Sequence, residues 1–156
     1  PIYEGTNGIQ AIDLVLRKIP LDDGAVLAGV IGEMSSELGT IEGHDQLAGF
    51  REELSVAIQG LAETSRWLGE RLASGDLQAA LAGASPYLRQ FGLVLGGWLM
   101  ARTAVAALGE PPGFEESFLA DKVTTARFYG EQLLPMANGL VPAVKGGASL
   151  LESAPF

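Results

Sequence analysis

The sequence predicts an all-α fold, an antiparallel helical bundle of about five to six helices joined by short links. Apolar residues recur at three- and four-residue steps along most of the chain, as they do on helices packed on one side. Pro and Gly pairs interrupt this pattern at intervals. No stretch alternates apolar and polar residues over the length of a convincing strand.

The first two helices are separated by Pro20. Asn7 is a favourable N-cap, and Gln10 can reach back to complete a pair that resembles a capping box, so the first helix is expected to begin at Asn7. A second helix is expected from Asp22 or Asp23 to about Leu38. Its apolar positions include Val26, Leu27, Val30, Ile31 and Met34.

The third helix has the clearest pattern and is expected to span about 28 residues. Its apolar positions are Leu47, Phe50, Leu54, Ile58, Leu61, Leu68 and Leu72. A Ser-Gly-Asp break follows, and a short helix is expected over Leu77–Ala82. A fourth long helix, Pro86–Leu108, is apolar nearly all round and should be central in the bundle.

Two further helices are predicted after the loop Gly109–Gly113. The fifth runs from about Glu115 to Leu134, with acidic residues at the positive end of its dipole. Pro135, or the Asn-Gly pair that follows, interrupts it. The last helix is expected around Leu140–Leu151.

Composition excludes several classes of function. The net charge of −9 argues against nucleic acid, because phosphate binding needs a positive patch. The absence of Cys removes disulfides and thiolate ligands. Arg102 and three glycines interrupt the most apolar stretch, so we expect a buried helix and no membrane span. The chain lacks both an initial Met and a leader pattern, which predicts a part of a longer protein.

Several polar residues favour structural roles. His44 is expected at the surface, and Glu33 with Glu37 on a solvated acidic face, because no Glu-x-x-His pairs accompany them; no metal site is predicted. Arg102 is expected to pair with a helical carboxylate or to reach the edge of the bundle. Trp67 and Trp98 are expected to be packing residues rather than a stacking platform.

The segment YEGTNG, Tyr3–Gly8, is the remaining candidate site. Backbone N–H groups at the start of a helix attract anions, and Gly5 lets a ligand approach the main chain closely. Taken alone, these residues also fit a surface turn in which Glu4 has no chemical role.

The stretch IYEGTNGIQAIDLVLRK, from Ile2 to Lys18, resembles the signature near the C-terminal end of the acyl-CoA dehydrogenases. In that family a Tyr-Glu-Gly-Thr turn leads into an Ile-Gln helix, and the Glu is usually the catalytic base. The resemblance implies that Glu4 removes the α-proton of an acyl-CoA while the β-hydride passes to FAD.

The resemblance also implies roles for the neighbouring residues. Tyr3 would line the substrate pocket, and Gly5 would lie beside the acyl thioester. Thr6, Asn7 and Gly8 would contact the flavin, with only the backbone serving at Gly8, where many members carry Gln. Implied partners are the acyl-CoA substrate, upstream domains of the same chain, an electron-transfer flavoprotein and further copies in a homo-oligomer.

The residues that follow the signature helix resemble the subgroup with a helical C-terminal extension, which includes long-chain acyl-CoA and 3-methylthiopropanoyl-CoA dehydrogenase-like proteins. We therefore expect residues 1–20 to end the catalytic domain and residues 21–156 to form an acetyl-CoA dehydrogenase-like C-terminal domain. The isolated chain is expected to be inactive and to bind no FAD, and a cytoplasmic location is expected. The alternative is a non-catalytic helical module for subunit contact, which the low share of charged residues, 19%, favours.

Overall fold

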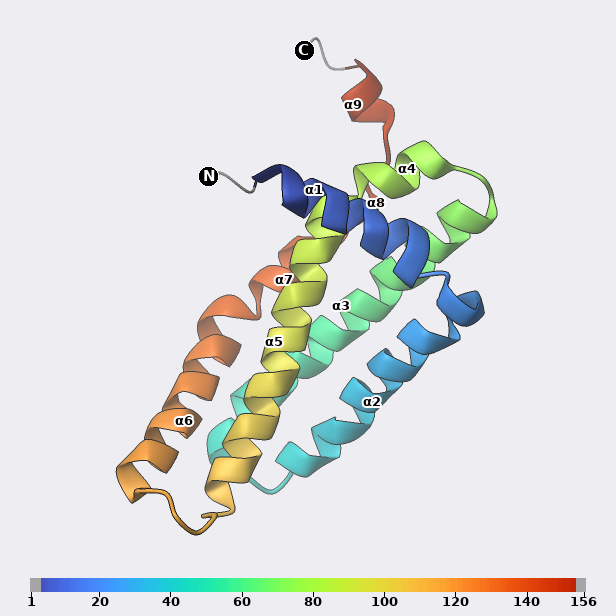
Figure 1. Cartoon of the computed structure of the whole chain (residues 1–156). Coiled ribbons are helices and arrows are strands. Elements are labelled where there is room, and N and C mark those ends of the chain that lie inside the picture. Colours follow the sequence, from blue (N-terminus) through green and yellow to red (C-terminus); the bar gives the residue numbers. More distant parts are fainter. Residues whose placement is uncertain (1–3, 154–156) are drawn as a thin grey trace.

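The computed structural model describes residues 4–153, and this part of the chain is an antiparallel helical bundle, as predicted. Its long helices are α2 (Ala25–Ile41), α3 (Ala48–Ala73), α5 (Ala84–Leu108) and α6 (Glu116–Phe128). They run alternately up and down beside one another, and α1 (Glu4–Asp13) lies across the end of the bundle where α5 begins (Figure 1).

The core lies where α3 and α5 pack against each other. The third helix buries a stripe at helical spacing, which includes Phe50, Leu54, Leu61 and Leu68. The predicted apolar face of this helix is therefore confirmed, and Leu72 lies half-buried at its end. Each fully buried aliphatic side chain contributes roughly 1.5–3 kcal/mol relative to an exposed one, so this stripe is a main source of stability.

The central position predicted for α5 is confirmed, since α5 contacts α1, α2, α3 and α6. Of the helices in residues 4–153, it alone is long and apolar enough, by length and composition, to cross a membrane, with a mean hydropathy of 1.6. The position of α5 inside the bundle also accounts for its apolar composition. A helix surrounded by neighbours needs apolar residues on several sides.

The N-terminal helices differ from the prediction at their boundaries. α1 begins at Glu4 rather than at Asn7, because continuing the backbone hydrogen bonds outweighs the roughly 1 kcal/mol of an Asn cap. It continues as a π-helical turn, Leu14–Lys18, and ends before Pro20 as expected. α2 begins at Ala25, after Asp22 and Asp23, which both adopt left-handed backbone angles (φ 53° and 52°).

The C-terminal prediction is partly wrong. α4 (Leu77–Ala82) agrees with it, and α6 continues through a π-helical turn, Tyr129–Leu133, close to the predicted end. The last predicted helix, Leu140–Leu151, is instead two short ones, α8 (Val141–Lys145) and α9 (Ser149–Ser153), and another short helix, α7 (Met136–Gly139), precedes them where an interruption was expected. Gly147 separates the last two with a φ of +70°, a conformation that glycine adopts without steric cost.

Candidate functional site

The predicted site residues lie at the start of α1. Glu4, Gly5 and Thr6 form the first turn of the helix rather than a turn before it, which corrects the prediction. Tyr3 lies outside the described residues, as do the side chains of Glu4 and Gly5. The backbone therefore places the predicted base at a helix N-terminus, where the first N–H groups have no partner within the helix.

The side chains that follow are available to a ligand. Thr6 and Asn7 are exposed, and neither side chain makes a hydrogen bond with another described residue. Gly8 is half-buried, and a Cβ added there would meet no atom within 4 Å. A hydroxyl and an amide thus lie on consecutive residues next to a glycine, and these two side chains suit a polar heteroaromatic edge.

Residues 9–19, which run from α1 through the π-helical turn that continues it, have two apolar sides. Ala11, Val15 and Ile19 are at most 4% exposed and pack into the bundle. Ile9 and Ile12 recur on another side and remain 70% and 44% exposed. A helix that is apolar on two sides usually lies between two packed layers, and the described chain supplies one of them.

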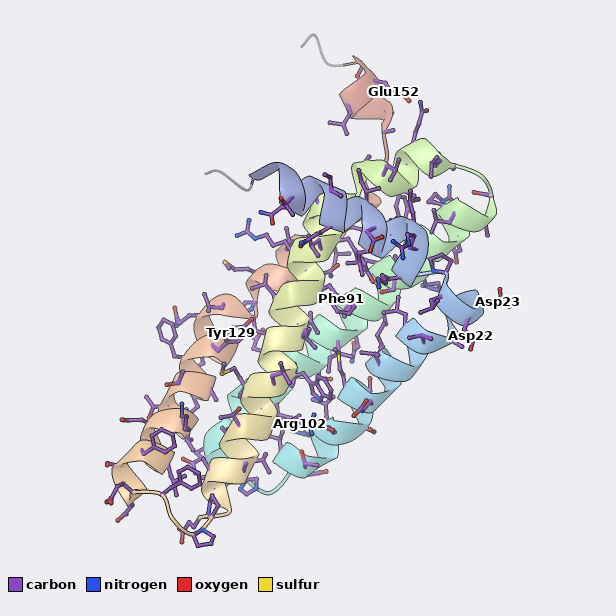
Figure 2. All side chains as sticks on the ribbon, in the orientation of Figure 1. Asp22, Asp23, Phe91, Arg102, Tyr129 and Glu152 are labelled. Atoms are coloured by element: carbon purple, nitrogen blue, oxygen red, sulfur yellow. The ribbon has the colours of Figure 1, made fainter. Side chains whose placement is uncertain are left out.

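The predicted carboxylate partner of Arg102 is confirmed as Glu37. Its Oε2 accepts a hydrogen bond of 2.8 Å from Trp98 Nε1 and lies 3.6 Å from Arg102 Nε. The guanidinium also lies over the Trp98 ring, 5.1 Å from the centroid, and Figure 2 shows Arg102 between α5 and α2. Glu37 is thus half-buried in a contact that links two helices, which corrects the solvated face predicted for it, whereas Glu33 is exposed.

The other predicted structural residues give no site. His44 is half-buried just before α3, rather than at the surface as expected, and its side chain bonds to no described residue. Trp67 is half-buried beneath Arg71 and packs against the core, and Trp98 is buried, so both are packing residues as predicted. Among residues 4–153, no group of three or more acidic or histidine side chains could hold a metal ion.

Sequence reasoning missed a buried polar contact between α3 and α5. Thr64 Oγ1 donates to Gln90 Oε1 at 2.8 Å, and Ser65 Oγ lies 2.7 Å from the Tyr87 hydroxyl. Burial raises the pKa of Tyr87 to about 12, although the hydrogen bond with Ser65 acts in the opposite direction. These neutral groups lock two core helices in register and carry no evident chemistry.

A cleft of about 780 Å³ is a second feature that the sequence did not reveal. It opens between the segment 19–24 and helices α2 and α3, and we name it the linker cleft. Aliphatic side chains line most of it: Ile19, Leu27, Ile31 and Leu72. Arg66 also lines the cleft and adds a positively charged guanidinium group to its wall. No short motif could have indicated it, because its walls come from three separate parts of the chain.

Comparison with known proteins places residues 30–155 in one family. They match the model described as "Acetyl-CoA dehydrogenase C-terminal like". The broad-specificity linear acyl-CoA dehydrogenase FadE5 of Mycobacterium tuberculosis is 34% identical over 86% of this chain and 24% of its own length. The 3-methylmercaptopropionyl-CoA dehydrogenase of Ruegeria pomeroyi is 33% identical over 86% of this chain and 23% of its own length.

A butyryl-CoA dehydrogenase of Syntrophomonas wolfei is 28% identical over 92% of this chain and 24% of its own length. The chain thus spans about a quarter of the length of the curated relatives that it matches. The family match lies on the helical bundle just described, and the relatives are acyl-CoA dehydrogenases, so the resemblance of the N-terminal signature and that of the bundle agree. The chain belongs to the acetyl-CoA dehydrogenase C-terminal-like family.

Proposed function

We propose that this chain is the catalytic C-terminal part of an FAD-dependent acyl-CoA dehydrogenase, in which Glu4 is the base. The observation that carries the proposal is the family match over residues 30–155, which adds to the signature residues at the start of α1. The overall reaction is the α,β-dehydrogenation of an acyl-CoA thioester. Upstream domains of the parent protein supply the rest of the flavin site and most of the acyl pocket.

In this proposal Glu4 takes the α-proton onto a carboxylate oxygen. The thioester acidifies that proton only weakly, so the base must act in a pocket from which water is excluded. Bound flavin supplies the hydride acceptor for the β-carbon. The first turn of α1 holds the base in place, and an error of ~1 Å in its position costs on the order of a hundredfold in rate.

Thr6 and Asn7 are the residues that would hold the flavin, with the Gly8 backbone beside them. Their exposed side chains and the lack of described partners support this assignment. The same exposure supports the expectation that the isolated chain is inactive, because one short helical turn encloses neither flavin nor substrate. The outer apolar side of α1, with Ile9 and Ile12, would pack against the upstream domains.

The test is the steady-state turnover of the intact parent protein with an acyl-CoA. Glu4→Gln should lower turnover by at least about a thousandfold while bound flavin stays at wild-type occupancy, since a missing base removes the proton-transfer step. Asp13→Asn is the matched control, because Asp13 is on the same helix but pairs with Arg17 at 2.8 Å. Normal turnover in Glu4→Gln, or equal losses in both variants, would refute the assignment.

A second candidate function is subunit contact by the helical extension. Exposed aromatic residues on one side of the bundle favour it: Phe114 and Phe128 are 57% and 61% exposed, and Phe114 stacks on Phe118 with ring centroids 5.6 Å apart. Single exposed apolar residues are common, but an exposed stacked pair fits an interface anchor better.

Light scattering of the intact parent distinguishes the two candidates. Replacing Phe114 and Phe118 with Ser should reduce the oligomer size while the Glu4 chemistry continues in the remaining species. Deletion of Leu21–Phe156 should likewise change the oligomer size. An unchanged size in both variants would exclude the contact role. Electron transfer to a separate flavoprotein and a cytoplasmic location complete the proposal, and both rest on the family resemblance.

A further inference from the structure

The linker cleft has the size and lining of a small-molecule site. Its volume of about 780 Å³ lies within the range of roughly 300–1,000 Å³ that is usual for ligand pockets. Its aliphatic lining comes from Leu27 and Ile31 on α2, from Leu72 on α3 and from Ile19 in the segment before α2. Gly32 and Gly69 also line the cleft, and a Cβ at either would meet no atom within 4 Å, so space remains beside both helices.

Arg66 is the cation that this apolar cleft offers. It makes no ion pair with a described residue, although the chain carries a net charge of −9. Its neighbour Glu63 is hydrogen-bonded to Lys145, and the charges of Lys145 and, more weakly, of Arg66 lower the pKa of Glu63. An exposed guanidinium that makes no direct ion pair, next to an aliphatic surface, is complementary to an anion that carries an apolar tail.

We propose that the linker cleft binds a linear aliphatic carboxylate. The tail lies among Ile19, Leu27, Ile31 and Leu72, and the carboxylate pairs with the Arg66 guanidinium. Asp23 also lines the cleft, and its negative charge disfavours a carboxylate beside it, so the head group belongs next to Arg66. This site is separate from Glu4 and does not depend on the proposed dehydrogenation.

A fatty carboxylate matches the linker cleft better than two other kinds of occupant do. A neutral or cationic amphiphile would leave the guanidinium unpaired while placing its tail on the same surface. A protein segment would have to present an acidic side chain within a run of aliphatic ones to match both parts of the cleft. A fatty carboxylate provides both in one small molecule.

The experiment is a calorimetric titration of the chain, which carries its own buried core, with decanoate below its micelle concentration. One saturable site is expected. Arg66→Gln should weaken binding about tenfold or more, as the loss of a hydrogen bond between charged groups requires. Arg89→Gln is the matched control, because Arg89 is another arginine without an ion pair among the described residues and does not line the cleft. Gly69→Leu should abolish binding by filling the space.

Ligand identity and location are tested in parallel. Decanol and decyltrimethylammonium should bind more weakly than decanoate by a similar tenfold factor or more. Methyl resonances of Ile19, Leu27, Ile31 and Leu72 should shift on titration. The proposal is overturned if decanoate shows no saturable binding, if decanol or the cation binds as tightly, if Arg66→Gln binds like Arg89→Gln, or if the shifts lie elsewhere.

Discussion

Gly130 offers the sharpest test of the packing between α3 and the end of α6. It is buried in the π-helical turn Tyr129–Leu133, directly against the ring of Phe50. A Cβ at this position would lie 2.4 Å from Phe50 Cδ2 and 2.7 Å from Cγ, whereas carbon atoms pack at about 3.5–4.0 Å. Phe50 is 2% exposed, so its ring has little room to retreat.

We predict that Gly130→Ala lowers the free energy of unfolding by roughly 1–2 kcal/mol. Overpacking a core costs about 1–3 kcal/mol, and replacing a helical Gly with Ala recovers about 0.5–1 kcal/mol. Gly92→Ala on α5 is the control, since Gly92 is exposed and its added Cβ meets no atom within 4 Å. That variant should be more stable than wild type by up to about 1 kcal/mol.

Urea unfolding followed by circular dichroism measures both variants, and the midpoints give the difference in stability. Combining Gly130→Ala with Phe50→Leu should recover part of the loss, because the smaller side chain makes room for the new methyl group. If Gly130→Ala proves as stable as wild type, the close approach of this turn to Phe50 is wrong.

Three further predictions concern the backbone and two titrating groups. Asp22→Gly and Asp23→Gly should each raise the free energy of unfolding by about 0.5 kcal/mol, and with it the urea midpoint, because both residues have left-handed backbone angles that glycine adopts freely. A lower urea midpoint in either variant would contradict this. Burial raises the pKa of Tyr87 to about 12, so the contribution of Tyr87 to stability should be constant up to the unfolded pKa near 10 and fall between about pH 10 and 12. Urea unfolding across this pH range should show that Tyr87→Phe lacks this part of the decline in stability. The hydrogen bond from Lys145 lowers the pKa of Glu63, so this pair should contribute its full stabilisation above the unfolded pKa near 4.3 and lose it as the pH falls through the lowered pKa of the folded state. In an NMR titration, Lys145→Gln should move the Glu63 midpoint up toward its ordinary value, and an unmoved midpoint would exclude the pairing.

The sequence was sufficient for the long helices because their signals are local. The stripe from Leu47 to Leu72 repeats over many turns, and the all-round apolar character of Pro86–Leu108 indicates a helix surrounded by others. Both features follow from spacing alone. The sequence was also enough to predict that Arg102 pairs with an acidic side chain or reaches solvent, because a cation on a core helix requires one or the other. It did not identify Glu37 as the partner.

Other features depend on contacts that no local pattern encodes. Asp22 and Asp23 suit the start of a helix by composition, yet the chain turns left-handed there before α2 begins. The linker cleft needs α2, α3 and the preceding segment to be placed together. The role of Glu4 stays a prediction, because the chemistry of this carboxylate depends on what encloses it.

The most direct test of the catalytic account is the anaerobic reduction of flavin in the intact parent by a single addition of acyl-CoA. The visible absorbance of oxidised flavin should disappear rapidly in the wild-type protein and persist in Glu4→Gln. The Asp13→Asn variant should behave like wild type. Rapid bleaching in Glu4→Gln would contradict the account, because hydride would then leave the β-carbon without this carboxylate removing the α-proton.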